Sequence, residues 1–129
     1  MTQRVLFICT GNIDRSRTAE DLYREDPRYE VRSAGTAPFA TVPVSQELLH
    51  WADKIFVMCE REDRHSTLLR MRFPDHRHDP VDLDIEDRWY RGDPELIRRL
   101  LTTLAPHLGS PQRAPARGKE DEQLGSDAG

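Results

Sequence analysis

Short apolar runs alternate with longer amphipathic stretches along most of the chain. Four of the apolar runs are rich in β-branched or aromatic residues, which is typical of strands buried in a parallel sheet. We predict these strands near residues 4–9, 29–33, 54–58 and 81–84. The amphipathic stretches predict helices near residues 16–25, 45–51, 61–72 and 94–107. This alternation predicts an α/β fold with three layers, α/β/α, around a small, roughly four-stranded parallel sheet.

The first predicted strand leads into the segment CTGNIDRS, residues 9–16, and then directly into a predicted helix. A loop between a strand end and a helix N-terminus turns its backbone N–H groups inward, and the helix dipole adds partial positive charge there. An anion is the natural ligand of such a loop. We therefore expect a phosphate-binding loop that includes Thr10, Gly11, Asn12, Ile13 and Asp14.

The residue types in this segment point to nucleophilic attack on a phosphoryl group. A helix N-terminus and a nearby guanidinium favour the thiolate form of a cysteine, so Cys9 is a candidate nucleophile. Arg15 offers a planar fork for two phosphoryl oxygens, and Ser16 is suited to donate a hydrogen bond to the Cys9 sulfur. Gly11 allows close approach of the backbone to an anion, and Asn12 tolerates the left-handed conformation that such loops often require.

Spacing alone does not establish this interpretation, because arginine is abundant in the chain and most free cysteines are buried core residues. The second cysteine, Cys59, is followed six positions later by His65 and so lacks an arginine at that spacing. The Gly-Asn pair in the loop, the strand before it and the helix after it favour a phosphate site around Cys9.

The segment 5–16, with Thr18-Ala19-Glu20 after it, resembles the N-terminal signature of the low-molecular-weight protein tyrosine phosphatase family. Three later segments resemble the family's second strand with its turn, its next strand, and the acidic, aromatic loop that carries its general acid. They are residues 31–36, 52–58 and 84–90. The resemblance runs in family order from about residue 4 to residue 108, although most of the segment between the second strand and the next is missing. A compact bacterial branch of predicted phosphatases is the most similar.

This resemblance implies a cysteine-dependent phosphomonoesterase with the flavodoxin-like fold of that family and a phosphatase domain at 1–108. It implies that Cys9 forms a phosphocysteine, that Arg15 clamps the phosphate, that Ser16 stabilises the thiolate and that Asn12 holds the shape of the loop. The implied substrate is a phosphorylated protein or a small phosphomonoester, with inorganic phosphate as the product. The chemistry requires no metal or cofactor, and we interpret the His-containing segment 75–79 as a solvated loop.

Three aspartates, Asp84, Asp87 and Asp93, compete for the role of general acid, which protonates the leaving oxygen and then activates water. Asp87 is followed by aromatic residues, as the family's acid is, but lacks the proline found there. Asp93 has the proline, but Asp-Pro before an apolar run is typical of a helix N-cap. We favour Asp87. Trp89 and Tyr90 are expected either to line the entrance, where they would stack on an aromatic ester, or to pack partly against the core.

Two other functions stay open. An arsenate reductase of this fold would use Cys59 as the resolving cysteine for Cys9, although the further cysteine of such enzymes is absent. A phosphate- or phosphoprotein-binding module would keep the loop but lack an effective acid. Asp14 occupies the position of a second cysteine in many family members, so the protective disulfide beside Cys9 is absent. We expect the Asp14 carboxylate to turn to solvent, or else to an arginine.

The composition sets the remaining bounds. The chain has 129 residues and a formal net charge of -4, which argues against a nucleic-acid-binding surface. With 33% charged residues it has no apparent membrane span, and the early first strand leaves no room for a signal peptide. Two cysteines without the spacing of a disulfide framework suit a reducing cytoplasm. Residues 109–129 are rich in glycine, proline and charge, and predict a disordered tail.

Overall fold

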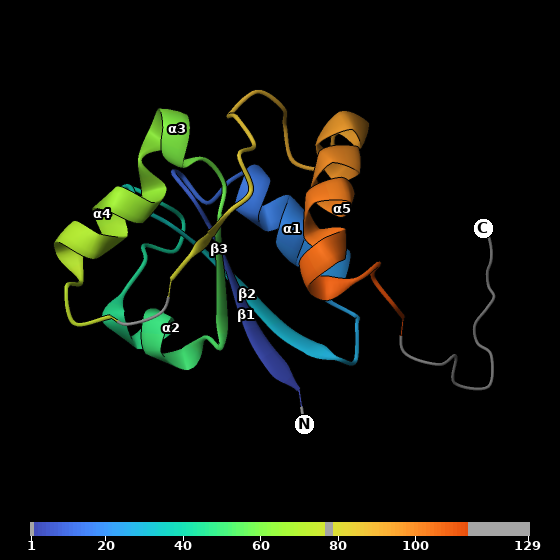
Figure 1. The fold of residues 1–129 in the computed structure, drawn as a ribbon. Coiled ribbons are helices and arrows are strands. Elements are labelled where there is room, and N and C mark those ends of the chain that lie inside the picture. The colour runs from blue at the N-terminus through green and yellow to red at the C-terminus, as the bar shows by residue number, and fades with distance from the viewer. Residues whose placement is uncertain (1, 77–78, 114–129) are drawn as a thin grey trace.

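The computed structural model describes residues 2–76 and 79–113, and its strands alternate with helices along the chain (Figure 1). The strands are β1 (Gln3–Cys9), β2 (Tyr29–Gly35), β3 (Lys54–Val57) and β4 (Val81–Asp82). The helices are α1 (Arg15–Tyr23), α2 (Gln46–Trp51), α3 (Glu60–Asp63), α4 (His65–Arg72) and α5 (Pro94–Leu108). Outside the region 60–72, these elements lie where the hydrophobic pattern predicts them.

The four strands form one parallel sheet in the order β2-β1-β3-β4, with helices on both faces. Helices α1 and α5 cover one face, which they contact through buried residues that include Tyr23 and Leu100. Helices α2 and α4 cover the other face, where Leu49 and Leu69 are buried. The prediction of a three-layer α/β/α fold is confirmed.

Strand β1 runs through the centre of the molecule, and its last five residues are all buried. Val5, Phe7 and Cys9 belong to the core on the side of α1 and α5, whereas Leu6 and Ile8 belong to the core on the side of α2 and α4. Because both faces are covered, this strand is a continuous apolar run rather than an alternating one. The strand ends at Cys9, at the carboxyl edge of the sheet, where open α/β folds bind their ligands.

The region 60–72 differs from the single predicted helix. Helices α3 and α4 meet at Arg64, whose left-handed backbone (φ 58°) interrupts helical geometry. The residues on either side, Asp63 and His65, both reach the loop after β1. No glycine or proline marks the break, so the sequence pattern carries no signal for it.

The first residues after α5 contact the domain. The Tyr23 hydroxyl donates to the Gly109 carbonyl at 2.7 Å, and Arg28 Nη2 donates to the Ser110 carbonyl at 2.8 Å. The backbone of residue 112 also donates to the buried carboxylate of Asp26. These contacts lie within the predicted tail, most of which, residues 114–129, lies outside the described residues.

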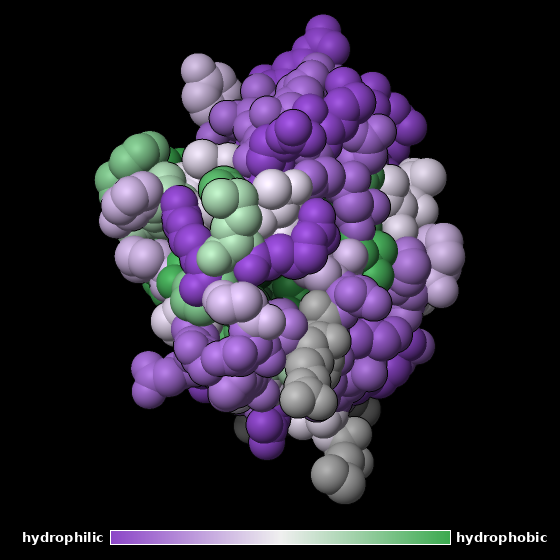
Figure 2. Space-filling model, turned by 60° about the vertical axis from the view of Figure 1, so that its left-hand side comes forward, coloured by the Kyte–Doolittle hydropathy of each residue, from purple (hydrophilic) through white to green (hydrophobic). Residues whose placement is uncertain are grey.

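Hydrophilic side chains dominate the face of the molecule shown in Figure 2, and apolar side chains form small, separate areas on it. The exposed large apolar residues are Ile13, Phe39, Val42, Met71 and Tyr90. In the part of the chain that the structure describes, no helix has both the length and the apolar character needed to cross a membrane.

Candidate active site

A pocket of about 220 Å³ lies at the carboxyl end of β1. It is lined by Cys9, Thr10, Gly11, Ile13, Asp14, Arg15, Phe39 and Asp87. Most of these residues belong to the predicted phosphate-binding loop, which therefore surrounds a single cavity. A larger pocket of about 390 Å³ lies between α1, α5 and residues 111–113, but its described lining contains no cysteine, serine or histidine. The smaller pocket is the candidate site.

The segment after β2 holds the backbone of the loop from outside. The carbonyl oxygens of Cys9, Thr10 and Gly11 accept hydrogen bonds from the N–H groups of residues 36, 37 and 41, at 2.9, 3.0 and 3.2 Å. Because the N–H of a trans peptide points opposite to its C=O, the N–H groups of these peptides turn away from that segment. Asn12 adopts the left-handed conformation, with φ 55°. The loop is thus preorganised to present N–H groups to an anion.

Asn12 orders a chain of hydrogen bonds that ends on the Cys9 sulfur. Its Oδ1 accepts from the Val42 N–H at 3.2 Å, so its Nδ2 donates to Ser16 Oγ at 2.8 Å and to Ser33 Oγ at 3.0 Å. Since Ser16 Oγ accepts from Asn12, its own proton is available to Cys9 Sγ, 3.0 Å away. Asn12 and Ser16 are fully buried. Water therefore does not compete for the hydrogen bond that would stabilise a Cys9 thiolate.

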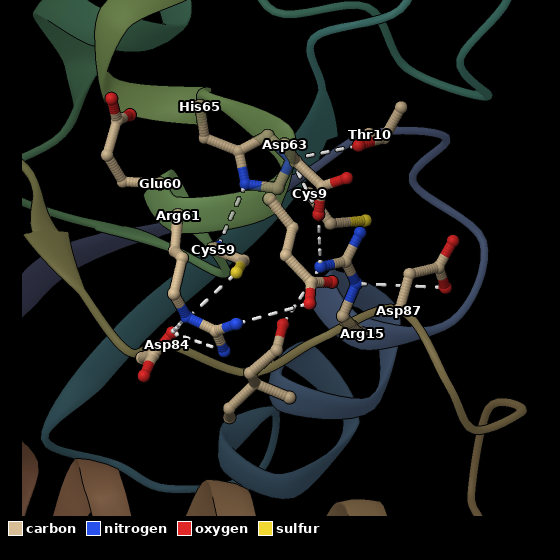
Figure 3. A network of polar contacts seen from close by, with 12 residues as sticks. Cys9, Thr10, Arg15, Cys59, Glu60, Arg61, Asp63, His65, Asp84 and Asp87 are labelled. Carbon is tan, nitrogen blue, oxygen red and sulfur yellow. Dashed lines mark hydrogen bonds and ion pairs between the residues drawn. The ribbon is translucent and has the colours of Figure 1, made fainter.

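Arg15 is buried, with only 2% of its side chain exposed, and three groups hold its guanidinium (Figure 3). Nη1 donates to Asp63 Oδ2 at 2.8 Å and to the Ile85 carbonyl at 2.9 Å. Nε lies 3.9 Å from Asp87 Oδ1. A buried cation requires such partners. They also orient the guanidinium in the pocket that it lines together with Cys9.

His65 also supports the loop and is fully buried. Its Nδ1 accepts a hydrogen bond from the Cys59 N–H at 3.1 Å, and its Nε2 lies 2.9 Å from Thr10 Oγ1. Burial, followed by the nearby charge of Arg15, lowers the pKa of His65 to about 4. The ring is therefore neutral at physiological pH. With Nδ1 as the acceptor, Nε2 carries the proton and donates to Thr10.

The structure separates the three candidate acids. Asp87 lines the pocket and has an exposed carboxylate, 64% accessible. Asp93 caps α5, because its Oδ1 accepts from the backbone N–H of residue 95 at 2.8 Å. Asp84 binds Arg61 Nε at 3.1 Å and does not line the pocket. Of these three aspartates, Asp87 has the placement that a general acid requires.

The aromatic residue at the entrance is not one of those expected from the sequence. Trp89 packs against the core, with the Arg99 guanidinium 4.9 Å from its ring, and Tyr90 is 82% exposed. Neither residue lines the pocket. Phe39, from the segment after β2, lines it together with Ile13, and both side chains are largely exposed. These two residues form an apolar rim.

Cys59 is buried and does not line the pocket. Its Sγ lies 3.7 Å from Asp84 Oδ1, and burial raises the pKa of its thiol. A thiol in this environment is a poor resolving nucleophile. Among residues 2–76 and 79–113, no group of three or more histidine, cysteine, aspartate or glutamate side chains is placed to hold a metal ion. Residues 77–78 of the His-containing segment lie outside those ranges.

Sequence reasoning missed three residues of the site: Asp63, His65 and Phe39. Asp63 and His65 lie in a stretch whose pattern predicts one continuous helix, and an interrupted helix leaves no trace in that pattern. Phe39 lies in an irregular segment between elements. The available signal for Phe39 was an aromatic residue, preceded by proline, in a loop next to the predicted site.

Known proteins match the part of the chain that builds this site. Residues 4–46, from β1 to the start of α2, match the family model for low molecular weight phosphotyrosine protein phosphatase. No curated protein matches the chain. YwlE arginine phosphatase from Geobacillus stearothermophilus is similar in structure, with a TM-score of 0.62 and 25% identity over 81% of this chain and 91% of that protein.

The tyrosine phosphatase Wzb from Escherichia coli K30, in complex with phosphate, shares the fold at a TM-score of 0.64 and 23% identity, over 80% of this chain and 94% of Wzb. The family model describes phosphatases, and both solved structures are phosphatases, so arsenate reduction is not favoured. The matched stretch carries the loop from Cys9 to Ser16 and the β2 segment that supports it. Residues 4–46 therefore match the low molecular weight phosphotyrosine protein phosphatase family that the sequence resembles, and the chain as a whole has the fold of these phosphatases.

Proposed function

We propose that the protein is a cysteine-dependent phosphomonoesterase in which Cys9 is the nucleophile, Arg15 binds the phosphoryl group and Asp87 is the general acid. The observation that carries this proposal is the meeting of the three side chains at one pocket, although Asp87 is far from the other two in sequence. Ser16 Oγ, 3.0 Å from Cys9 Sγ, supplies the hydrogen bond that a thiolate needs.

The reaction has two steps. In the first, the Cys9 thiolate attacks phosphorus and forms an S–P bond, while the P–O bond to the leaving group breaks and Asp87 gives its proton to the leaving oxygen. In the second, water attacks phosphorus, the Asp87 carboxylate takes a proton from this water, and the S–P bond breaks to release inorganic phosphate. Arg15 and the loop N–H groups hold the equatorial oxygens throughout. Neither step requires a metal or cofactor.

The rim of the pocket favours an aromatic phosphoester, such as phosphotyrosine in a protein or a small aryl phosphate. Ile13 and Phe39 offer exposed apolar surface to a flat ring. The similarity to YwlE arginine phosphatase makes phosphoarginine an alternative substrate. Its guanidinium group is cationic, and an apolar rim offers such a group no polar partner. We expect kcat/KM for a phosphotyrosine peptide to exceed that for the matched phosphoarginine peptide.

Hydrolysis of p-nitrophenyl phosphate tests the proposal. We expect turnover by the wild type and by Cys59→Ser, but none by Cys9→Ser. Equal rates in the wild type and Cys9→Ser would contradict it. Tight phosphate binding without turnover of this activated ester would identify a binding module instead.

We also propose that the enzyme acts in the cytoplasm. A thiolate nucleophile has to remain reduced, and both cysteines are free in the structure.

A further inference from the structure

Asp14 is the N-cap residue of α1, yet its carboxylate makes no capping hydrogen bond to this helix. A capping aspartate normally accepts from the second or third N–H of its own helix, which stabilises the helix by about 1 kcal/mol. Here Asp14 Oδ1 instead accepts from the backbone N–H of Arg91 at 2.9 Å. It does not simply face solvent, as its polar neighbours in the sequence suggested. Arg91 lies in the segment between β4 and α5 that carries Asp87.

Two further residues of α1 hold the same part of that segment. Thr18 Oγ1 accepts from the Gly92 N–H at 3.1 Å and donates to the Asp14 carbonyl at 2.7 Å. The Arg91 guanidinium makes two hydrogen bonds to the Asp21 carboxylate, both at 2.8 Å, and they lower the pKa of Asp21. Residues 91–92 are therefore fixed along the first two turns of α1.

The other end of the segment is fixed at Ile85. Its N–H donates to the Met58 carbonyl at the end of β3, its side chain is buried, and its carbonyl accepts from Arg15 Nη1. Between these two anchors lie residues 86–90, including the exposed Asp87 carboxylate. An exposed acid has few contacts of its own, so its position depends on these anchors and on Trp89, which packs against the core two residues later.

We propose that Asp14 is a positioning residue that holds the segment 85–92, and with it Asp87, over the phosphate-binding loop. The inference rests on the proposed function, because Asp14 would act through Asp87. Asp14 is itself part of the loop that holds Cys9 and Arg15, so its hydrogen bond ties the segment that carries the acid directly to the loop that carries the nucleophile. Loss of this bond weakens acid catalysis, which matters most for substrates whose leaving oxygen is strongly basic.

The test compares kcat/KM for phenyl phosphate, whose leaving phenolate needs a proton, with that for p-nitrophenyl phosphate, whose leaving group needs little. In Asp14→Ala, we expect the value for phenyl phosphate to fall about tenfold further than that for p-nitrophenyl phosphate. Asp14→Asn removes the charge but keeps an oxygen that accepts from the Arg91 N–H. We therefore expect this variant to keep the wild-type ratio of kcat/KM for phenyl phosphate to kcat/KM for p-nitrophenyl phosphate. In an Asp87→Asn background, Asp14→Ala should change the ratio no further.

Asp53→Ala is the matched control, because Asp53 Oδ2 also accepts a backbone N–H, that of Arg4, at 2.9 Å. Its hydrogen bond is at the start of β3, and we expect the wild-type ratio. Amide exchange at Arg91 provides a readout independent of catalysis, and it should accelerate in Asp14→Ala but not in Asp14→Asn or Asp53→Ala.

An unchanged Arg91 exchange rate in Asp14→Ala would overturn the hydrogen-bonding role. An unchanged substrate ratio in Asp14→Ala, with a changed ratio in Asp87→Asn, would overturn the positioning of the acid. If Asp87→Asn left the ratio of the two kcat/KM values unchanged, the assignment of Asp87 as the general acid in the proposed function would fail. Faster Arg91 exchange in Asp14→Ala would then still show that Asp14 anchors the segment, so the two failures can be told apart.

Discussion

The carboxylate of Asp63 binds the guanidinium of Arg15 at 2.8 Å, from the last residue of a four-residue helix. The left-handed Arg64 follows, and His65 then reaches Thr10. Figure 3 shows Asp63 and His65 on the same side of the phosphate-binding loop. The break between α3 and α4 thus supplies two supports for the loop.

Loss of the Asp63 carboxylate leaves Arg15 with one fewer partner in a buried position. We expect Asp63→Asn to reduce kcat/KM for p-nitrophenyl phosphate by about tenfold to a hundredfold, because a misoriented guanidinium binds the transition state less well. Glu62→Gln, an exposed neighbour on α3 that pairs with Arg61, is the control and should retain wild-type activity. Equal kinetics in both variants would show that Asp63 does not orient Arg15.

His65 makes the stability of the fold depend on pH. The folded protein binds a proton at His65 only near pH 4, whereas the unfolded chain binds it near pH 6.5. Between these values the unfolded chain holds more protons, so stability is complete above about pH 6.5 and falls, by about 3 kcal/mol at most, as the pH drops toward 4. Denaturant unfolding of the wild type and His65→Gln at a series of pH values measures this. Between pH 6.5 and pH 4, the free energy of unfolding should fall less steeply in His65→Gln than in the wild type. Identical pH dependence in the two proteins would contradict the lowered pKa of His65.

Gly35 has to lack a side chain because β2 ends directly against the phosphate-binding loop. A Cβ at this position would lie 2.4 Å from the Thr10 carbonyl oxygen and 2.6 Å from Ala40 Cβ. We expect Gly35→Ala to destabilise the fold by about 1–3 kcal/mol and to reduce activity by displacing the loop. A Cβ at Gly11 would meet its nearest atom at 3.5 Å, an ordinary contact, so Gly11→Ala should be the more stable of the two variants. Thermal unfolding compares them, and the reverse order would refute the steric argument.

The apolar rim predicts a substrate effect that is confined to aromatic esters. Phe39→Ala should raise KM for p-nitrophenyl phosphate severalfold, because the lost ring contact costs about 1 kcal/mol of binding free energy. KM for a small alkyl phosphate should stay unchanged. Tyr90→Ala removes an exposed ring outside the pocket and should affect neither substrate. A larger effect at Tyr90 than at Phe39 would favour the arrangement that the sequence suggested.

Local sequence patterns predicted the sheet and most of the helices because each strand and helix carries its own periodicity. The phosphate-binding loop was also predictable from a local pattern, because Cys9, Asn12, Arg15 and Ser16 lie close together in the chain. Asp87 was favoured as the acid because its segment resembles a known acid loop, and the only local pattern that helped was the helix N-cap signature at Asp93.

The supports of the loop depend on contacts between distant segments, and local patterns do not encode them. Asp63, His65 and Phe39 reach the pocket through a helix break and an irregular segment. Asp14 has the sequence position of a helix cap, yet it binds Arg91, 77 residues later. In each case a tertiary contact replaces the local role that the sequence favours.

The most direct test of the central claim is identification of the covalent intermediate. Asp87→Asn should slow the hydrolysis of the intermediate, so rapid acid quenching during turnover of p-nitrophenyl phosphate should trap it. Mass spectrometry of the digested protein is predicted to find one phosphoryl group on the peptide that contains Cys9, bound to sulfur. A phosphoryl group on any other residue, or turnover with no phosphorylated Cys9 at any quench time, would contradict the account.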